Sequence, residues 1–134
     1  MLVVEDNNDL RNFILEILIQ AGYNTTFAIN GEEAIEKVKS YKPDIILTDL
    51  MMPKLSGADL IQYLKSTERF KTIPIALLTA KAEAETKKEM HIIGADSFLS
   101  KPFNEDELLA VVKNLLQLKF TEKYFVKEIL KAKS

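Results

Sequence analysis

Short apolar runs alternate with segments of helical periodicity along most of this chain. The runs at residues 44–48 and 75–79 are almost continuously apolar, as expected of parallel strands that helices cover on both faces. Strands and helices that alternate in this way form a doubly wound parallel sheet with right-handed connections. The sequence therefore predicts an α/β fold of five βα units. The predicted strands are residues 1–4, 25–29, 44–48, 75–79 and 97–100.

Apolar spacing and capping residues indicate where the helices lie. The first helix has apolar residues at helical spacing, and Gly22 ends it: Leu10, Phe13, Ile14, Ile17, Leu18 and Ala21. Three later helices begin with a polar residue and have an acidic residue three positions on: Asn30 with Glu33, Ser56 with Asp59, and Asn104 with Glu107. A further helix is expected at residues 83–93, where the apolar pattern is weakest.

Composition excludes several classes of protein. A chain of 134 residues fits one domain, and a hydrophobic content of 47% can supply its core. The absence of cysteine excludes disulfides, thiolate zinc sites and cysteine nucleophiles, and makes the cytoplasm the expected compartment. No apolar run approaches the roughly 18 residues of a membrane span, and the acidic start MLVVED does not fit a signal peptide. A net charge of −2 argues against nucleic acid as a direct partner.

Polar residues stand at the ends of four predicted strands. Glu5 and Asp6 follow the first strand, and Asp49 follows the third. Thr79 ends the fourth strand, and Lys101 follows the fifth. The carboxyl ends of parallel strands share one edge of the sheet, where open α/β sheets bind their ligands. The sequence therefore predicts one site that contains three carboxylates, a hydroxyl and an ammonium group.

This set of groups indicates phosphoryl chemistry. Clustered carboxylates repel one another and require a cation, and Mg²⁺ suits them because it takes carboxylates together with water and a phosphate oxygen. Lys101 and Thr79 can contact the remaining phosphoryl oxygens. Asp49, in the middle of the cluster, can then attack phosphorus and form an acyl phosphate. Positioning and charge neutralisation would supply most of the catalysis.

Four motifs stand at these strand ends in order: Glu5-Asp6, Asp49 in TDLMMPKLSG, Thr79-Ala80, and Lys101-Pro102-Phe103 after GADSFLS. Each motif alone is weak, but the four in order, each ending a strand, are specific. Together they resemble a receiver domain of bacterial two-component response regulators. The resemblance covers residues 1–118 and implies a flavodoxin-like (βα)5 sheet with strand order 2-1-3-4-5. It also implies a cis bond between Lys101 and Pro102.

The resemblance implies a role for each residue of the site. Asp49 accepts the phosphoryl group from a phosphohistidine of a histidine kinase or phosphotransfer domain. The domain would catalyse its own phosphorylation and dephosphorylation rather than the turnover of a free substrate. Asp6 binds Mg²⁺ directly, Glu5 acts mainly through water, and the Met51 backbone carbonyl is a further ligand. Lys101 pairs with the phosphoryl group.

The resemblance also implies a conformational switch. Thr79 hydrogen-bonds the phosphoryl group and moves toward it, and the aromatic side chain of Phe98 turns inward behind it. The surface formed by residues 83–117 then changes its downstream partner, an output domain or protein. Phe98 has no hydroxyl, so we expect packing alone to set its rotamer.

Three other functions fit parts of the pattern. A phosphatase of the haloacid dehalogenase type needs a second acid two residues after its nucleophile, where this chain has Met51. A nucleotide or flavin domain would carry a GxGxxG, Walker or Ser/Thr-rich phosphate loop, which the chain lacks. An interaction module without phosphoryl chemistry would not need all five site residues. His91, the single histidine, is expected on a surface, so the donor histidine belongs to another domain or protein.

Residues 119–134 differ from the rest of the chain in charge. They contain 5 Lys and 2 Glu, whereas residues 1–118 contain 13 basic and 18 acidic residues, so we expect a boundary near Leu118. Apolar residues in this segment, and a strand that starts at residue 1, suggest a domain cut from a longer chain. We hypothesise a linker helix that also contacts a second copy; a plain extension of the final helix or a tail packed on a neighbour is the alternative. The motifs resemble receivers of hybrid sensor kinases with a fused DNA-binding output domain, and a stand-alone chemotaxis-type regulator is the alternative.

Overall fold

The computed structural model describes residues 1–52, 54–80, 88 and 92–133. Five parallel strands in this part of the chain form one sheet in the order β2-β1-β3-β4-β5, which confirms the predicted fold class. The strands are β1 (Leu2–Val4), β2 (Thr26–Ala28), β3 (Ile46–Asp49), β4 (Ile75–Thr79) and β5 (Ser97–Ser100). The described helices are α1 (Asn8–Gln20), α2 (Gly31–Ser40), α3 (Gly57–Ser66) and α5 (Glu105–Lys133).

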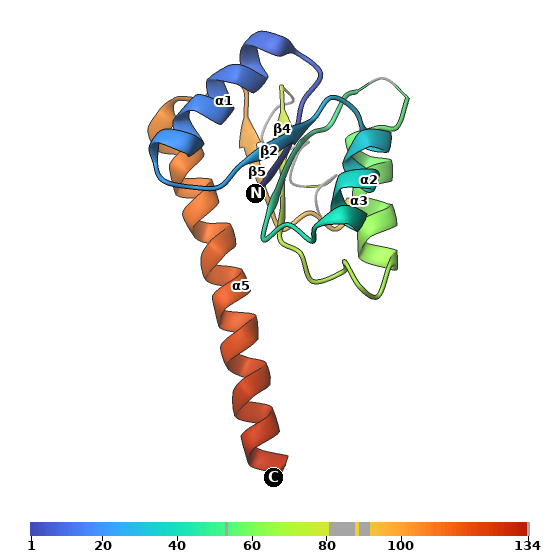
Figure 1. Ribbon diagram of the computed structural model, residues 1–134, viewed down its shortest axis with the longest axis vertical. Coiled ribbons are helices and arrows are strands. Elements are labelled where there is room, and N and C mark those ends of the chain that lie inside the picture. The colour runs from blue at the N-terminus through green and yellow to red at the C-terminus, as the bar shows by residue number, and fades with distance from the viewer. Residues whose placement is uncertain (53, 81–87, 89–91, 134) are drawn as a thin grey trace.

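Helices cover both faces of the sheet (Figure 1). The helices α1 and α5 pack on one face, and α2 and α3 pack on the other. Because side chains alternate along a strand, Val3, Leu47 and Leu78 pack toward α1 and α5, whereas Leu2 and Leu77 pack toward α2 and α3. All five side chains are fully buried, which explains why the central strands are continuously apolar.

The predicted caps form at the three later helices. The Asn30 side chain accepts a hydrogen bond from the Glu33 amide at 2.9 Å, and the Ser56 hydroxyl accepts one from the Asp59 amide at 3.1 Å. At α5 the box is reciprocal: the Glu107 amide donates to the Asn104 side chain at 2.8 Å, and the Asn104 amide donates to the Glu107 carboxylate at 3.2 Å. These bonds satisfy amides that have no partner inside the helix.

The helix α1 differs from its prediction in which face it buries. It begins at Asn8, and Phe13 remains 43% exposed although it belongs to the predicted apolar face. Arg11 is instead only 8% exposed and shares the buried face with Ile14 and Leu18. Arg11, Ile14 and Leu18 are spaced i, i+3 and i+7, so they lie on one face of the helix. The buried face is therefore rotated toward Arg11 relative to the predicted one.

The helix expected at residues 83–93 lies mostly outside the described residues, as does His91. Among the positions of this segment, Lys88, Ile92 and Ile93 are described, each with helical backbone. The location of this helix therefore stays a prediction.

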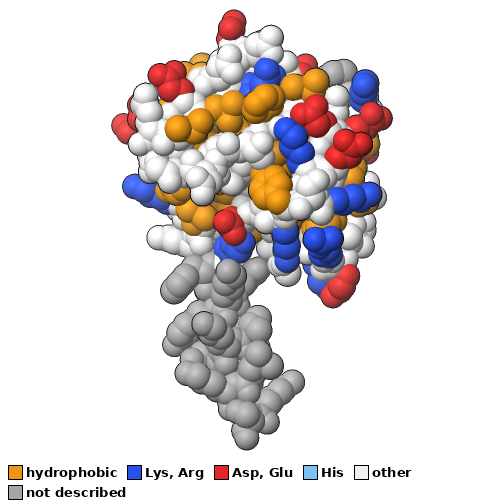
Figure 2. Space-filling model, in the orientation of Figure 1, with side chains coloured by type: hydrophobic (Ala, Val, Ile, Leu, Met, Phe, Trp, Pro, Cys, Tyr) orange, Lys and Arg blue, Asp and Glu red, His pale blue; other side chains and the backbone are white. Residues whose placement is uncertain are grey.

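The helix α5 continues to Lys133, well past the edge of the sheet, and projects from the body (Figure 1). Its last fully buried residue among those described is Leu115. No described helix, α5 included, is both long and apolar enough to cross a membrane. Figure 2 shows acidic and basic side chains interspersed over the body on the face in view, so this face has no dominant patch of one sign.

Candidate functional site

The predicted site residues come together at the carboxyl edge of the sheet. Glu5 follows β1 directly, Asp49 is the last residue of β3, and Thr79 is the last residue of β4. Lys101 follows β5, and its amide donates to the Thr79 carbonyl at 2.7 Å. The strand register places Asp49 beside Leu78 and Thr79 beside Ser100, so the strand ends are level with one another. Strand ends that share an edge explain how residues far apart in sequence form one cluster.

Three carboxylates form the centre of this cluster. Glu5, Asp6 and Asp49 each offer an oxygen atom, and these atoms lie within 4.8 Å of one another. Glu5 is fully buried and Asp49 is nearly so, whereas Asp6 is exposed. The cluster is therefore open to solvent on the side of Asp6. All-oxygen donors at this spacing suit a hard cation such as Mg²⁺.

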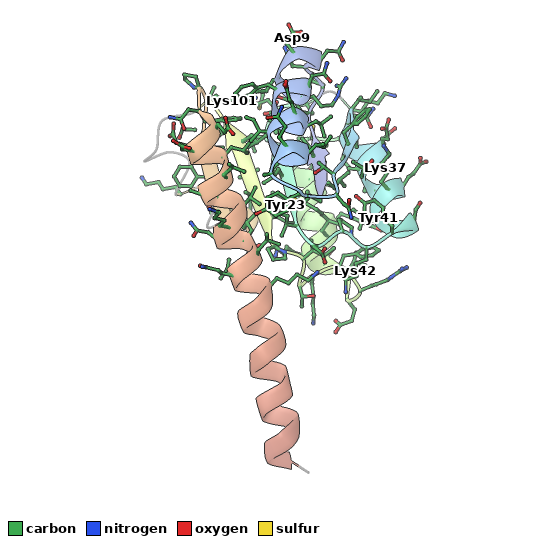
Figure 3. The ribbon with its side chains drawn as sticks, turned by 60° about the vertical axis from the view of Figure 1, so that its left-hand side comes forward. Asp9, Tyr23, Lys37, Tyr41, Lys42 and Lys101 are labelled. Atoms are coloured by element: carbon green, nitrogen blue, oxygen red, sulfur yellow. The ribbon has the colours of Figure 1, made fainter. Side chains whose placement is uncertain are left out.

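Lys101 lies between two of the carboxylates. Its Nζ donates to Asp49 Oδ2 at 3.1 Å and to Glu5 Oε1 at 3.2 Å. Figure 3 shows Lys101 at the end of the body where α5 starts, opposite the end from which α5 projects. The peptide bond to Pro102 is cis, as the resemblance implied.

The ionisation of the cluster reflects its burial. Burial raises the pKa of Glu5 to about 8, and the hydrogen bond and charge of Asp49 add to this shift while Lys101 opposes it. For Lys101, burial lowers the pKa, but the hydrogen bonds and charges of Asp49 and Glu5 outweigh burial and raise it overall. One ammonium group therefore does not fully compensate the buried carboxylates.

The chain around Asp49 is held by close backbone packing. The Met51 amide donates to Asp49 Oδ1 at 3.3 Å, and the Gly57 amide donates to the Leu50 carbonyl at 3.0 Å. A Cβ atom at position 57 would lie only 2.1 Å from the Asp49 carbonyl oxygen, so this position requires glycine. Met51 is 73% exposed and is not part of the core.

The two residues predicted to switch lie on the neighbouring strands β4 and β5. Thr79 is buried, with 2% of its surface exposed. Phe98 is half-buried and packs against the core on the side of α2 and α3. It lies on β5, three residues before Lys101.

Arg11 contacts the main chain of the acidic pair, which the sequence interpretation did not predict. Its Nη1 donates to the Glu5 carbonyl at 3.0 Å and lies 3.5 Å from the Asp6 carbonyl, and its Nη2 donates to Asn8 Oδ1. The guanidinium also lies over the Phe27 ring, with Cζ 4.9 Å from the ring centroid. The sequence signal that could have identified Arg11 is its spacing, since it lies three and seven residues before the apolar residues Ile14 and Leu18 of α1.

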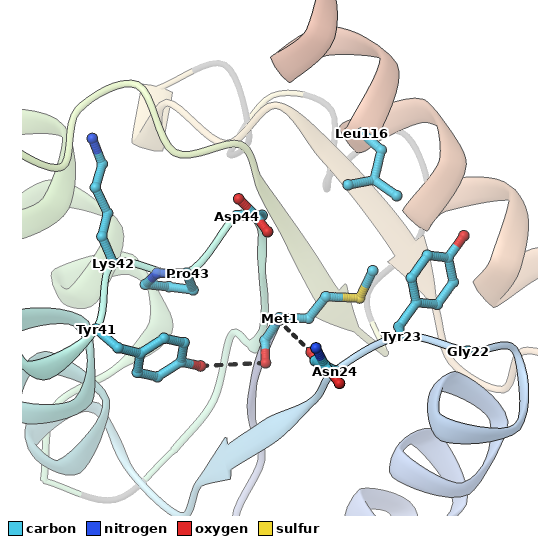
Figure 4. A pocket seen from close by; sticks show the side chains of 9 residues that line it. All are labelled: Met1, Gly22, Tyr23, Asn24, Tyr41, Lys42, Pro43, Asp44 and Leu116. Carbon is cyan, nitrogen blue, oxygen red and sulfur yellow. Dashed lines mark hydrogen bonds between the residues drawn. The ribbon is translucent and has the colours of Figure 1, made fainter.

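A pocket of about 410 Å³ lies at the opposite, amino edge of the sheet (Figure 4). Tyr23 and Tyr41 stand on either side of Met1 there, and the Tyr41 hydroxyl donates to the Met1 carbonyl at 3.4 Å. None of the predicted site residues is among the described residues that line this pocket. The carboxylate cluster, rather than this pocket, is therefore the candidate for phosphoryl chemistry.

Comparisons with known proteins agree with the geometry. Residues 1–113 match the family model of the response regulator receiver domain. The chain is 40% identical over 132 residues to hybrid signal transduction histidine kinase D of Dictyostelium discoideum, which covers 98% of this chain and 8% of that protein. The chain spans between 8% and 56% of the length of the first three curated relatives it matches.

Solved structures show the same fold. The signal receiver domain of a signal transduction histidine kinase from Syntrophus aciditrophicus has a TM-score of 0.80 and 34% identity, covering 87% of this chain and 88% of that chain. The receiver domain of a sensor histidine kinase from Pseudomonas aeruginosa PAO1 has a TM-score of 0.79 and 28% identity, covering 87% and 95%. The latter structure is named as having a magnesium ion coordinated in the active site cleft.

Proposed function

This chain belongs to the family of response regulator receiver domains, the phosphoacceptor switches of two-component signalling, and from this premise we propose that Asp49 accepts the phosphoryl group. The observation that carries the proposal is the convergence of the Glu5, Asp6 and Asp49 carboxylates with the Lys101 ammonium at one edge of the sheet. In the transfer, an Asp49 oxygen forms a bond to phosphorus while the bond from phosphorus to the donor histidine nitrogen breaks.

Mg²⁺ is the cation that we propose for the carboxylate cluster. Glu5, Asp6 and Asp49 supply oxygen ligands, and by resemblance to the family the Met51 carbonyl is a fourth candidate. The raised pKa of Glu5 agrees with this assignment, since burial, and next the nearby Asp49, make the ionised form costly unless a cation is bound. Bound there, the ion would neutralise the phosphoryl oxygens during transfer.

Lys101 and Thr79 would hold the transferred group. Lys101 already contacts Asp49 Oδ2, so its ammonium can move by a short distance from the carboxylate to a phosphoryl oxygen. Thr79, joined to Lys101 through the backbone hydrogen bond, would donate its hydroxyl to a second oxygen. We propose that this movement draws Phe98 inward and changes the surface of residues 83–117.

The partners follow from the family. A receiver domain interacts with a histidine kinase or phosphotransfer domain and with an output partner. For this chain, the similarity to a hybrid histidine kinase supports an origin in a hybrid two-component system that regulates transcription. We place residues 1–118 in the cytoplasm as the receiver and residues 119–134 as the helical linker to the rest of such a protein.

Intact mass spectrometry tests the assignment of Asp49. Incubation with Mg²⁺ and acetyl phosphate is expected to add one phosphoryl group to the wild type and none to Asp49→Asn. Asp59→Asn is the matched control, because Asp59 is an exposed residue of the first turn of α3 and should leave the adduct unchanged. A chelator should abolish the adduct, because charge neutralisation by the cation is lost. An adduct on Asp49→Asn would contradict the assignment.

A further inference from the structure

We propose that Arg11 is a positioning residue that holds the acidic pair Glu5-Asp6 in the geometry that binds Mg²⁺. The inference rests on the proposed function, since it concerns the same cation. It adds a residue of α1 to a site that otherwise consists of residues at strand ends. Arg11 would not touch the cation or the phosphoryl group, and would act through the loop between β1 and α1.

Arg11 contacts two main-chain carbonyl groups of this loop and one side chain at the start of α1. Nη1 donates to the Glu5 carbonyl at 3.0 Å and lies 3.5 Å from the Asp6 carbonyl. Nη2 donates to the side chain of Asn8, the first residue of α1. One rigid, planar group therefore joins both acidic residues to the start of the helix, which a lysine ammonium at the same place cannot do.

The guanidinium of Arg11 donates its hydrogen bonds to carbonyl oxygens rather than to carboxylates. Among the ion pairs of the described residues, none joins Arg11 to the carboxylate of Glu5 or Asp6. The carboxylates of both residues thus remain directed toward Asp49, within 4.8 Å of one another. A buried cation that paired with them would compete with Mg²⁺, whereas one that binds their carbonyls orients them without occupying their oxygens.

The Phe27 ring fixes the guanidinium from the side of β2. Arg11 Cζ lies 4.9 Å from the ring centroid, and Lys37 Nζ lies at the same distance from it. Both cations thus make the same kind of contact with one ring. Lys37 pairs with Glu33 and donates to the Phe27 carbonyl, but makes no described contact with the acidic pair. Lys37 is therefore a matched control for Arg11.

Magnesium titration by isothermal calorimetry tests the inference on the whole chain. Arg11→Lys keeps the positive charge but loses the two-nitrogen geometry of the guanidinium. We expect the affinity of this variant for Mg²⁺ to fall about 10-fold, as for other groups that orient metal ligands. Asn8→Ala leaves Arg11 in place but removes the hydrogen bond that Nη2 makes, so the Mg²⁺ affinity of this variant should fall by less. Lys37→Met removes a charge near the same ring and should leave the affinity unchanged. Urea unfolding without Mg²⁺ identifies the conditions in which each variant is folded.

A purely structural role for Arg11 would lower stability without changing the affinity of the folded protein. Wild-type affinity in both Arg11→Lys and Asn8→Ala would overturn the inference while the proposed function stands. An equal loss in Lys37→Met would also overturn it, because the effect would then be one of net charge. If the wild type bound no Mg²⁺, the proposed cation and this inference would both fail. Should Arg11→Lys not fold, Asn8→Ala with wild-type affinity would still overturn the inference.

Discussion

Glu5 is a buried residue of the site whose ionisation changes on folding. It is fully buried, it accepts a hydrogen bond from Lys101, and its pKa is raised from 4.5 to about 8 by burial and by Asp49. Folding therefore favours the protonated form of Glu5 over the ionised form found in the unfolded chain at neutral pH. A bound cation would reverse this preference, because metal ligands bind in their deprotonated form.

The stability of the protein without Mg²⁺ is therefore expected to depend on pH. A raised pKa in the folded state contributes stability that is complete below pH 4.5 and is lost as the pH rises through about 8. Urea unfolding should show a loss on the order of a few kcal/mol across this range, and Glu5→Gln should remove it. Lys101 stays charged throughout, because its pKa is raised.

Glu36→Gln, a change at an exposed position of α2, is the control for loss of a carboxylate and should retain the wild-type pH dependence. Saturating Mg²⁺ should flatten the dependence of the wild type. Equal stability of the wild type at pH 5 and pH 8 without Mg²⁺ would contradict the proposed environment of Glu5.

Two helices begin with a glycine that packs against the chain around the site. Gly57, at the start of α3, lies against the Asp49 carbonyl, where an added Cβ would come within 2.1 Å. Gly31, at the start of α2, lies against Leu55, where an added Cβ would come within 2.7 Å. The position of Asp49, the proposed phosphoacceptor, therefore depends on how closely α3 approaches β3.

Gly57→Ala is expected to destabilise the protein by about 3 kcal/mol, because the clash is with the backbone of a central strand that cannot move away. Gly31→Ala should cost less, because the loop around Leu55 can shift. The free energy of unfolding in urea, followed by circular dichroism, measures both. A smaller loss for Gly57→Ala than for Gly31→Ala would contradict this packing argument.

The sequence predicts those elements that depend on neighbouring residues or on a pattern repeated along the chain. The caps at Asn30, Ser56 and Asn104 form as predicted because each depends on residues within one helical turn. The strand ends meet as predicted because topology brings every carboxyl end to one edge. Their strand order came from the resemblance to receiver domains, since alternation alone does not specify it.

The errors in α1 have a tertiary cause. Leu10 and Phe13 continue an apolar spacing, yet Phe13 is exposed with its ring centroid 6.3 Å from that of Phe103, and Arg11 is buried. The rotation of this helix depends on the Glu5 and Asp6 carbonyls, which attract Arg11 but have no signature in the sequence of α1. Backbone acceptors of this kind become apparent only when the loop is seen in three dimensions.

At the scale of the whole molecule, the protein consists of a packed body and an extended helix. The described core of α5 ends at Leu115, and beyond it Lys119 pairs with Asp44 near the amino edge of the sheet. The side chain of Asp44 is 68% exposed, so this ion pair should contribute little. Residues 1–118 are thus expected to hold nearly all of the folding free energy.

Truncation after Leu118 is expected to change the free energy of unfolding by less than about 1 kcal/mol, the upper value for an exposed ion pair. Light scattering of the full chain and of residues 1–118 tests the hypothesised contact with a second copy, which predicts a larger mass only for the full chain. Equal masses would contradict the dimer contact. A large loss of stability on truncation would contradict the boundary near Leu118.

The projection of α5 from the body has a mechanical consequence. At 1.5 Å per residue, the helix from residue 119 to Lys133 reaches roughly 22 Å beyond Leu118. A tilt of about 5° where the helix leaves the body moves its far end by roughly 2 Å. The helix can therefore act as a lever. A tilt too small to alter the packing of the body becomes a displacement of at least a bond length at the far end.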